Sequence, residues 1–140
     1  EITTRLVGSE MCIRDRKHPV IRKKLDNAVC GMEGMHAHDV NADRMEVSQN
    51  AKTLAVSFAG YDRKKCKDDL VYVAVNAYWE EVRITLPNLA NHGAWYLSVD
   101  TYGDENGKYC YEEGEEIRID HEYVMKPRSI VVFTGRQVLR

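Results

Sequence analysis

Two histidines form the pattern along this chain that comes nearest to a metal site. His36, His38 and Asp39 read H-x-H-D. In an extended segment, side chains two residues apart point the same way, so both imidazoles could bind Zn²⁺ with one or two further ligands. No third ligand follows at a characteristic spacing. We interpret the segment as a polar loop, keep His36 and His38 as the candidate metal ligands, and expect no metal or other cofactor.

Aromatic residues are the second group with possible chemistry. Tyr78 and Trp79 stand where an apolar strand pattern gives way to a polar turn. Exposed rings can stack on the apolar face of a sugar, and Trp95 and Tyr102 are further candidates for this role. Aromatic side chains also dominate domain interfaces and cores, so packing on a neighbouring domain is the interpretation we favour. Tyr78 and Trp79 are the candidate substrate-binding residues.

Other catalytic or binding signatures are missing from the sequence. The cysteines are 18, 36 and 44 residues apart and form no C-x-x-C pair, which argues against a zinc or thioredoxin-type motif (Cys12, Cys30, Cys66 and Cys110). Sparse, unpatterned cysteines are typical of a reducing cytosol. No glycine-rich loop precedes a helix, and no serine lies in a G-x-S-x-G context.

Composition narrows the class of partner. The chain has 140 residues, which favours one domain, and a formal net charge of −2. This charge gives no electrostatic reason to expect nucleic acid or an anionic membrane as a partner. No apolar run approaches the roughly 18 residues of a membrane span, and the N-terminal residues do not resemble a secretory signal. We therefore expect a cytoplasmic protein.

The elements that must position these residues are strands. Leu70 to Val75 is apolar at every position, which predicts a strand buried between two layers. From Val82 to Leu86, apolar and polar residues alternate, which predicts a strand with one wet face. Leu54, Val56 and Phe58 alternate in the same way and predict another strand.

The rest of the chain follows the same pattern. Ala94 to Asp100 predicts a strand with Trp95, Leu97 and Val99 on one face, and Ser129 to Thr134 predicts a buried final strand. Pro19 is expected to open a turn after a helix end, and 27–50 to be a long loop with at most one short strand. About six to eight strands with frequent turns predict an all-β fold, an antiparallel β-sandwich after a short N-terminal helical remnant.

The order of these motifs resembles a known family. KHPVIRKK, TLAVSF, DLVYVAVNAYWEEVRITLP, WYLSVDT and YVMKPRSIVVFTGR are similar to the C-terminal end of glycogen-debranching and isoamylase-type enzymes of the α-amylase superfamily. The resemblance covers residues 17–136 in pieces, and NAYWE and KPRSIVVF are its most specific parts. Relatives often carry tryptophans before the TLAVSF strand, where this chain has GMHAHDVNADRM.

The resemblance implies a division of the chain. Residues 17–50 would be a remnant of the last barrel helix with a long loop, and 51–140 the C-terminal β-sandwich. Residues 1–16 contain VGSEMCIRDR, which resembles translated sequencing-adapter sequence. We expect 1–16 to be non-native or disordered and to pack poorly.

The resemblance also implies where catalysis resides. The parent enzyme would be a retaining α-1,6-glucan hydrolase, whose two carboxyl groups lie about 5 Å apart on a barrel of about 250 residues. This chain is too short to contain that barrel, so we expect a non-catalytic domain that stabilises it. Asp100, Asp104 and Glu112 are then turn or surface carboxylates. The expected partners are the barrel and an α-glucan.

Two rival hypotheses remain open. The chain could be a stand-alone carbohydrate-binding module for α-glucans, which requires a row of exposed aromatic rings. It could also be an enzyme in its own right that uses a metal held by His36 and His38.

Overall fold

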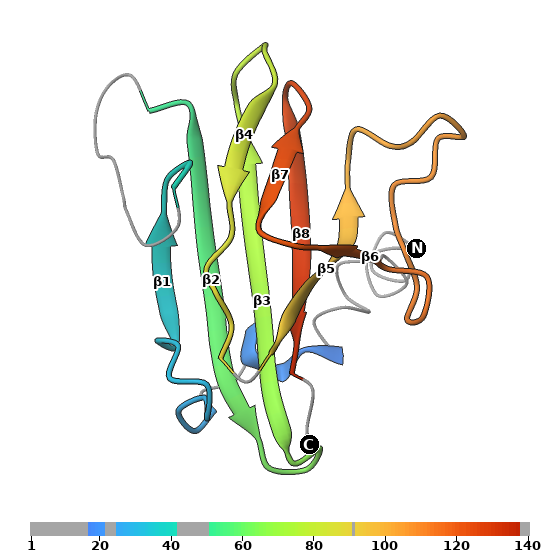
Figure 1. Cartoon of the computed structure of the whole chain (residues 1–140). Helices are drawn as coiled ribbons and strands as arrows, with labels where there is room; N and C mark the ends of the chain where they lie inside the picture. Colours follow the sequence, from blue (N-terminus) through green and yellow to red (C-terminus); the bar gives the residue numbers. More distant parts are fainter. Residues whose placement is uncertain (1–16, 22–24, 42–50, 91, 138–140) are drawn as a thin grey trace, which may run out of the picture.

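The computed structural model describes residues 17–21, 25–41, 51–90 and 92–137. They form two antiparallel β-sheets packed face to face (Figure 1). The larger sheet has the strand order β1-β2-β3-β8-β5-β6, and β4 pairs with β7 in the smaller one. The elements are η1 (Pro19–Ile21), β1 (Met35–His38), β2 (Thr53–Asp62), β3 (Lys67–Asn76), β4 (Val82–Thr85), β5 (Ala94–Asp100), β6 (Ile117–Ile119), β7 (Glu122–Met125) and β8 (Ser129–Arg136). The expected all-β antiparallel sandwich is confirmed.

Pro19 begins η1, a short 3-10 helix, as its fixed φ and missing N–H favour. β1 is a short strand within 27–50, the segment expected to be a long loop, and it forms one edge of the larger sheet by pairing with β2. Residues 42–50 of that segment lie outside the described residues. The expectation that 1–16 pack poorly also falls outside the described part of the chain.

The hairpin of β2 and β3 forms the middle of the larger sheet. The two strands pair along their whole length, from Thr53 opposite Asn76 to Asp62 opposite Lys67. Successive side chains point to opposite faces, so each strand contributes to both sides of the sheet. We call the side that carries Tyr72 and packs against β4 and β7 the inner face, and the opposite side the outer face.

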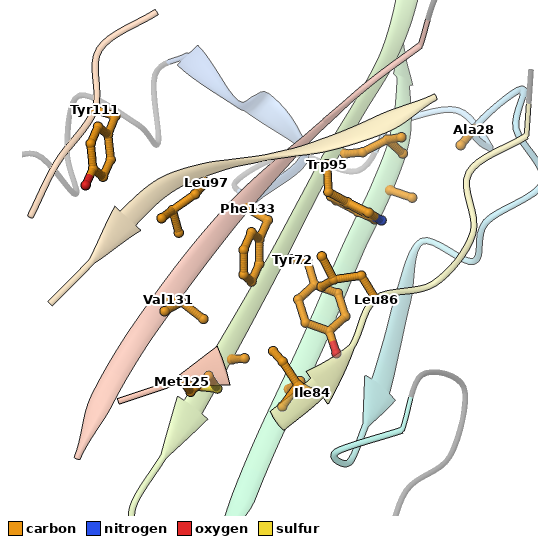
Figure 2. Packing of buried hydrophobic residues seen from close by; sticks show 14 residues of the cluster. Ala28, Tyr72, Ile84, Leu86, Trp95, Leu97, Tyr111, Met125, Val131 and Phe133 are labelled. Carbon is orange, nitrogen blue, oxygen red and sulfur yellow. The ribbon is translucent and has the colours of Figure 1, made fainter. Parts of the chain in front are cut away.

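The core lies between the inner face and the smaller sheet (Figure 2). Tyr72 of β3, Phe133 of β8 and Trp95 of β5 are each at most 2% exposed. Their rings meet at tilted or edge-on angles, with Tyr72 5.8 Å from Trp95 and 6.1 Å from Phe133. The smaller sheet and its flanking loop cover them with Ile84, Leu86 and Met125, which are also buried. The prediction of one solvent-exposed face for the strand that is now β4 agrees with this packing, because Ile84 is buried and Arg83 is exposed.

One facial assignment from the sequence is wrong. Val99 does not share a face with Trp95 and Leu97, because the register of β5 against β8 shifts between Leu97 and Val99. Leu97 is opposite Phe133 of the inner face, whereas Val99 is opposite Val132, which points outward. An extra residue in one strand reverses the alternation that follows it. Ser98, at the bulge, is fully buried and bonds to Thr134 through its hydroxyl at 2.8 Å.

Two turns at one end of the sandwich are tied together by Asn76, which is 1% exposed. Its amide nitrogen donates to the carbonyls of Glu80 and Lys126, at 3.0 and 3.1 Å, and its amide oxygen accepts from the backbone of Tyr78. The backbone N–H of Arg128 donates in turn to the carbonyl of Tyr78 at 3.0 Å. The turn between β3 and β4 and the turn between β7 and β8 are therefore fixed relative to each other (Figure 1).

We expect Tyr123 to make the fold sensitive to alkali. Burial, followed by a 2.5 Å hydrogen bond to Asp100, raises the pKa of Tyr123 far above its ordinary value of about 10. The stabilisation is complete below the unfolded pKa and declines as the pH rises above it. Urea titrations between pH 8 and 11 should show a steeper loss of stability for the native chain than for Tyr123→Phe. Parallel curves would contradict this role.

Candidate functional site

The outer face of the larger sheet is unusually apolar. The register of β1, β2, β3 and β8 places ten apolar side chains on it (Met35, Ala37, Leu54, Val56, Phe58, Val71, Val73, Val75, Ile130 and Val132). Three of them are strongly exposed: Met35 at 68%, Leu54 at 49% and Ile130 at 42%. On β2 the side chains of Leu54, Val56 and Phe58 face outward, while the smaller Ala55, Ser57 and Ala59 are buried on the inner face. Exposed large apolar side chains on an apolar sheet face are typical of an interaction surface.

The segment around η1 covers one end of the outer face (Figure 1). Asp69 of β3 holds it, because its carboxylate accepts from Nδ1 of His18 at 2.7 Å and from the backbone N–H of Val20 at 3.1 Å. Gly60 allows the close approach, since a Cβ there would lie 2.7 Å from Cβ of Leu25. At the opposite end of the outer face, Leu54 and Ile130 are exposed.

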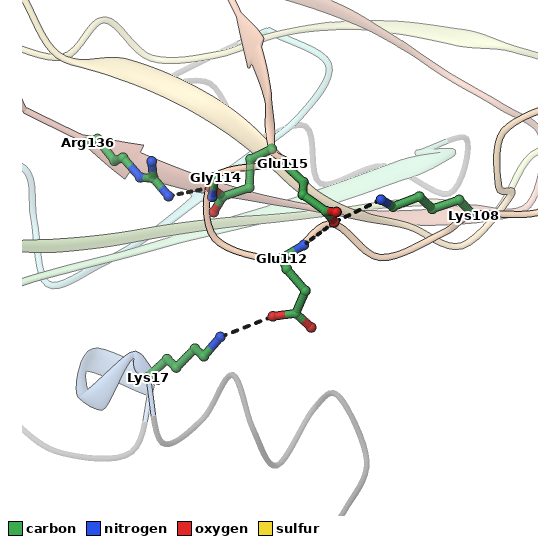
Figure 3. A network of polar contacts seen from close by, with 7 residues as sticks. Lys17, Lys108, Glu112, Gly114, Glu115 and Arg136 are labelled. Atoms are coloured by element: carbon green, nitrogen blue, oxygen red, sulfur yellow. Dashed lines mark hydrogen bonds and ion pairs between the residues drawn. The ribbon is translucent and has the colours of Figure 1, made fainter.

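A charged cleft of about 220 Å³ lies beside η1. Arg136 and Glu116 line it and form an ion pair, and Lys17, which also lines it, pairs with Glu112; in the same loop Lys108 pairs with Glu115 (Figure 3). The acidic run at 112–116 is thus more than the solvated loop its composition suggests, since the side chain of Glu116 is only 7% exposed. Both charge signs line the cleft, so it has no clear preference for an anion or a cation.

Tyr78 and Trp79 lie together on the turn after β3. Their ring centroids are 4.4 Å apart with an angle of 37° between the planes. Trp79 is 65% exposed, whereas Tyr78 is half-buried with the ammonium of Lys52 3.9 Å from its ring centroid. Tyr102, on the turn after β5, is 60% exposed. Trp95 is 2% exposed and cannot meet a ligand, so its candidacy for sugar contact is wrong.

His36 and His38 are neighbours, as their spacing predicts, with ring centroids 4.8 Å apart. Each already has a partner: His36 bonds to Glu33 through Nδ1 at 2.7 Å, and the buried His38 bonds to Ser57 at 2.9 Å. Burial, with a further contribution from Asp68, raises the pKa of the nearby Cys30 thiol and disfavours the thiolate that binds metals. Within the described residues, no group of three His, Cys, Asp or Glu side chains could hold a metal ion.

The carboxylates considered for catalysis have structural environments. Asp104 caps its own turn, because its Oδ1 accepts from the backbone of Asn106 and Lys108 at 2.8 and 2.9 Å. Asp100 is 7% exposed and accepts from Tyr102 and Tyr123. Glu112 is exposed and pairs with Lys17. Asp104 and Glu112 are the turn and surface carboxylates expected, whereas Asp100 is buried.

The fold and these surfaces define a class of protein: an antiparallel β-sandwich domain with an open apolar sheet face. The family model described as "Isoamylase, C-terminal" matches residues 23–134 of the chain. The chain therefore belongs to the isoamylase C-terminal domain family and is similar to the C-terminal region of isoamylase-type enzymes. No curated protein matches it. Among the described residues, no helix has the length and apolar character needed to cross a bilayer.

Proposed function

We propose that the chain is the non-catalytic C-terminal sandwich of a cytoplasmic glycogen-debranching enzyme of the isoamylase type, and that it stabilises the catalytic barrel of that enzyme. The parent would be a retaining hydrolase of α-1,6 branch linkages. The observation that carries the proposal is the outer face, because an apolar sheet surface of this kind stabilises a protein only when another layer covers it.

The position of η1 supports the catalytic barrel as the occupant. Residues 17–50 are proposed as the barrel-helix remnant and loop, and 51–140 as the sandwich. Lys17 to Ile21 lie against the outer face, held by Asp69. The chain that precedes the sandwich therefore approaches from the side of the outer face. A barrel joined there would lie on the side of the outer face.

The environments of the candidate carboxylates support a non-catalytic role. Asp100 and Asp104 already accept two hydrogen bonds each from this chain, which leaves them poorly placed to act as a nucleophile or an acid. We expect the purified chain to leave pullulan uncleaved.

The docking proposal is tested by placing charge on the outer face. The chain alone should bind a fluorescent apolar dye, self-associate, and raise the melting temperature of an isoamylase-type barrel prepared without its own C-terminal domain. The double variant Met35→Lys/Leu54→Lys should lose all three properties while remaining folded, because both side chains are exposed and lysine is tolerated on strand surfaces. Analytical ultracentrifugation and thermal shift assays measure these effects.

The matched control is Ile117→Lys. Ile117 is 47% exposed, similar to Leu54, but it lies on β6 opposite Leu97 of the inner face. This variant should behave as the native chain. A native chain that stays monomeric, binds no dye and leaves the barrel unchanged would overturn the proposal.

The alternative is a stand-alone carbohydrate-binding module. It rests on a different observation, the exposed ring of Trp79 beside Tyr78. In this alternative, the main role of the chain is to bind sugar and not to stabilise a catalytic barrel.

A further inference from the structure

Two consecutive aspartates are buried near the hairpin end of β2 and β3. Asp68 and Asp69 are 7% and 8% exposed. Because successive residues of a strand point to opposite faces, Asp68 points to the inner face with Tyr72, and Asp69 points to the outer face. A buried carboxylate is costly unless hydrogen bonds satisfy its oxygens. In both aspartates these bonds come from the part of the chain that precedes β1.

The two carboxylates hold this part of the chain from opposite sides of the sheet. On the outer face, Asp69 uses one oxygen for the imidazole of the η1 segment and the other for its backbone. On the inner face, the two oxygens of Asp68 accept from the backbone N–H groups of Val29 and Cys30, at 2.7 and 2.8 Å. All four oxygens are therefore used, each by a different donor. Hydrogen bonds to an ionised acceptor are about twice as strong as those between neutral groups.

Between these two attachments the chain crosses the edge of the sheet. The backbone N–H of Tyr61 donates to the carbonyl of Asp26 at 2.8 Å, past the end of the pairing of β1 with β2. The carboxylate of Asp26 pairs with Arg63 on the hairpin turn. Ala28 then joins the core and is 7% exposed. The chain before β1 thus passes around β2 from the outer to the inner face, at the end of the hairpin that extends beyond the smaller sheet (Figure 1).

Attachment on both faces has a consequence for whatever precedes residue 17. A segment held at one point can rotate about it, whereas a second attachment on the opposite face prevents that rotation. We propose that Asp68 and Asp69 form a clasp that makes the chain before β1 a rigid joint, which sets the direction from which the preceding polypeptide approaches the outer face. A partner oriented in advance loses less rotational freedom when it docks. That this partner is the catalytic barrel rests on the proposed function, whereas the rigidity of the joint does not.

The rigidity is tested by NMR spectroscopy of the full chain in a weakly aligning medium. Residual dipolar couplings of the backbone N–H groups in 17–21 and 25–30 should fit the alignment tensor obtained from the strands. In the variant Asp68→Ala/Asp69→Ala, the couplings of these two segments should fall toward zero while the strands keep theirs. Segments that fit the tensor no better in the native chain than in this variant would overturn the joint.

Hydrogen exchange separates the two attachments. Asp69→Ala should accelerate exchange of the Val20 amide about ten-fold or more, as expected for loss of a hydrogen bond to a charged group, and leave the amides of Val29 and Cys30 unchanged. Asp68→Ala should do the reverse, so each variant is the matched control for the other. The central amides of β3 report any loss of overall stability. If both variants accelerate every amide by one common factor, the carboxylates only stabilise the fold and the clasp is refuted.

A milder pair of variants covers the case in which the alanine variants do not fold. Asp68→Asn and Asp69→Asn each keep one of the two acceptor oxygens. Asp68→Asn should therefore accelerate one of the two amides that it holds and leave the other protected. Full protection of both amides in Asp68→Asn would count against the clasp.

The clasp and the docking proposal stand or fail separately. The variant Met35→Lys/Leu54→Lys should keep the native dipolar couplings, because neither side chain takes part in the four hydrogen bonds of the clasp. A native chain with a rigid joint that leaves the melting temperature of the barrel unchanged would support the clasp and refute the docking. A native chain that stabilises the barrel while the couplings of 17–21 and 25–30 average to zero would refute the clasp alone.

Discussion

Replacing Trp95 by alanine should lower the free energy of unfolding by about 3–5 kcal/mol, the usual cost of deleting a buried tryptophan. Its ring is 2% exposed and lies edge-on to Tyr72. The change also removes the donor to the carbonyl of Pro87, a 2.8 Å bond that joins β5 to the loop after β4. Because small domains are stable by only about 5–15 kcal/mol, a large part of the stability should be lost.

Trp79→Ala is the natural comparison for this change. Trp79 is 65% exposed, so its removal should alter stability by no more than about 0.5 kcal/mol. Urea denaturation followed by circular dichroism measures both variants on one scale. Equal destabilisation of the two would mean that Trp79 is covered in the native chain, which would also remove the basis of the carbohydrate-binding alternative.

The two tryptophans also show how far the sequence could be interpreted. Both lie in or next to a predicted strand, and the sequence made both candidates for stacking on a sugar. Trp95 falls within an alternating strand, which is enough to predict one buried face, whereas Trp79 lies on the polar turn after Asn76. Alternation places a residue on a face of a sheet, but it does not say which face another layer covers.

β2 illustrates the same limit. The alternation of Leu54, Val56 and Phe58 correctly predicted a strand, and a large apolar face is normally the buried one. In the structure the small residues face the core, where Ser57 lies opposite the buried ring of Tyr72. The large face points outward to a surface that the described residues leave partly open. Only the packing of the smaller sheet decides between the two faces.

Local irregularities were beyond prediction for a different reason. The bulge in β5 depends on the pairing with β8, a strand that is distant in the chain. No pattern within β5 itself therefore predicts that Val99 points to the outer face. The ion pairs of the acidic loop with Lys17 and Arg136 depend in the same way on distant segments. By contrast, the single-residue signal at Pro19 was sufficient, because the φ preference of proline is local.

Asn76, the first residue of the motif NAYWE, joins the turn after β3 to the turn after β7 through its side-chain amide. Asn76→Ala should lower the free energy of unfolding by about 2–4 kcal/mol, since three hydrogen bonds of a 1% exposed side chain are lost at about 1 kcal/mol each and the carbonyls of Glu80 and Lys126 lose a donor. The turn that carries Trp79 should loosen at the same time. Hydrogen exchange of the Tyr78 and Arg128 amides should therefore accelerate more than that of the central β3 amides.

The matched control for Asn76 is Asn88→Ala, because Asn88 is an exposed asparagine in the loop after β4. Its removal should change stability by no more than about 0.5 kcal/mol. Asn76→Asp provides a further comparison, since aspartate can still accept from the backbone of Tyr78 but cannot donate to the carbonyls of Glu80 and Lys126. It should be nearly as destabilising as alanine. If Asn76→Asp has native stability, the donor bonds between the turns contribute little, and rigidity of the Trp79 turn must come from the backbone alone.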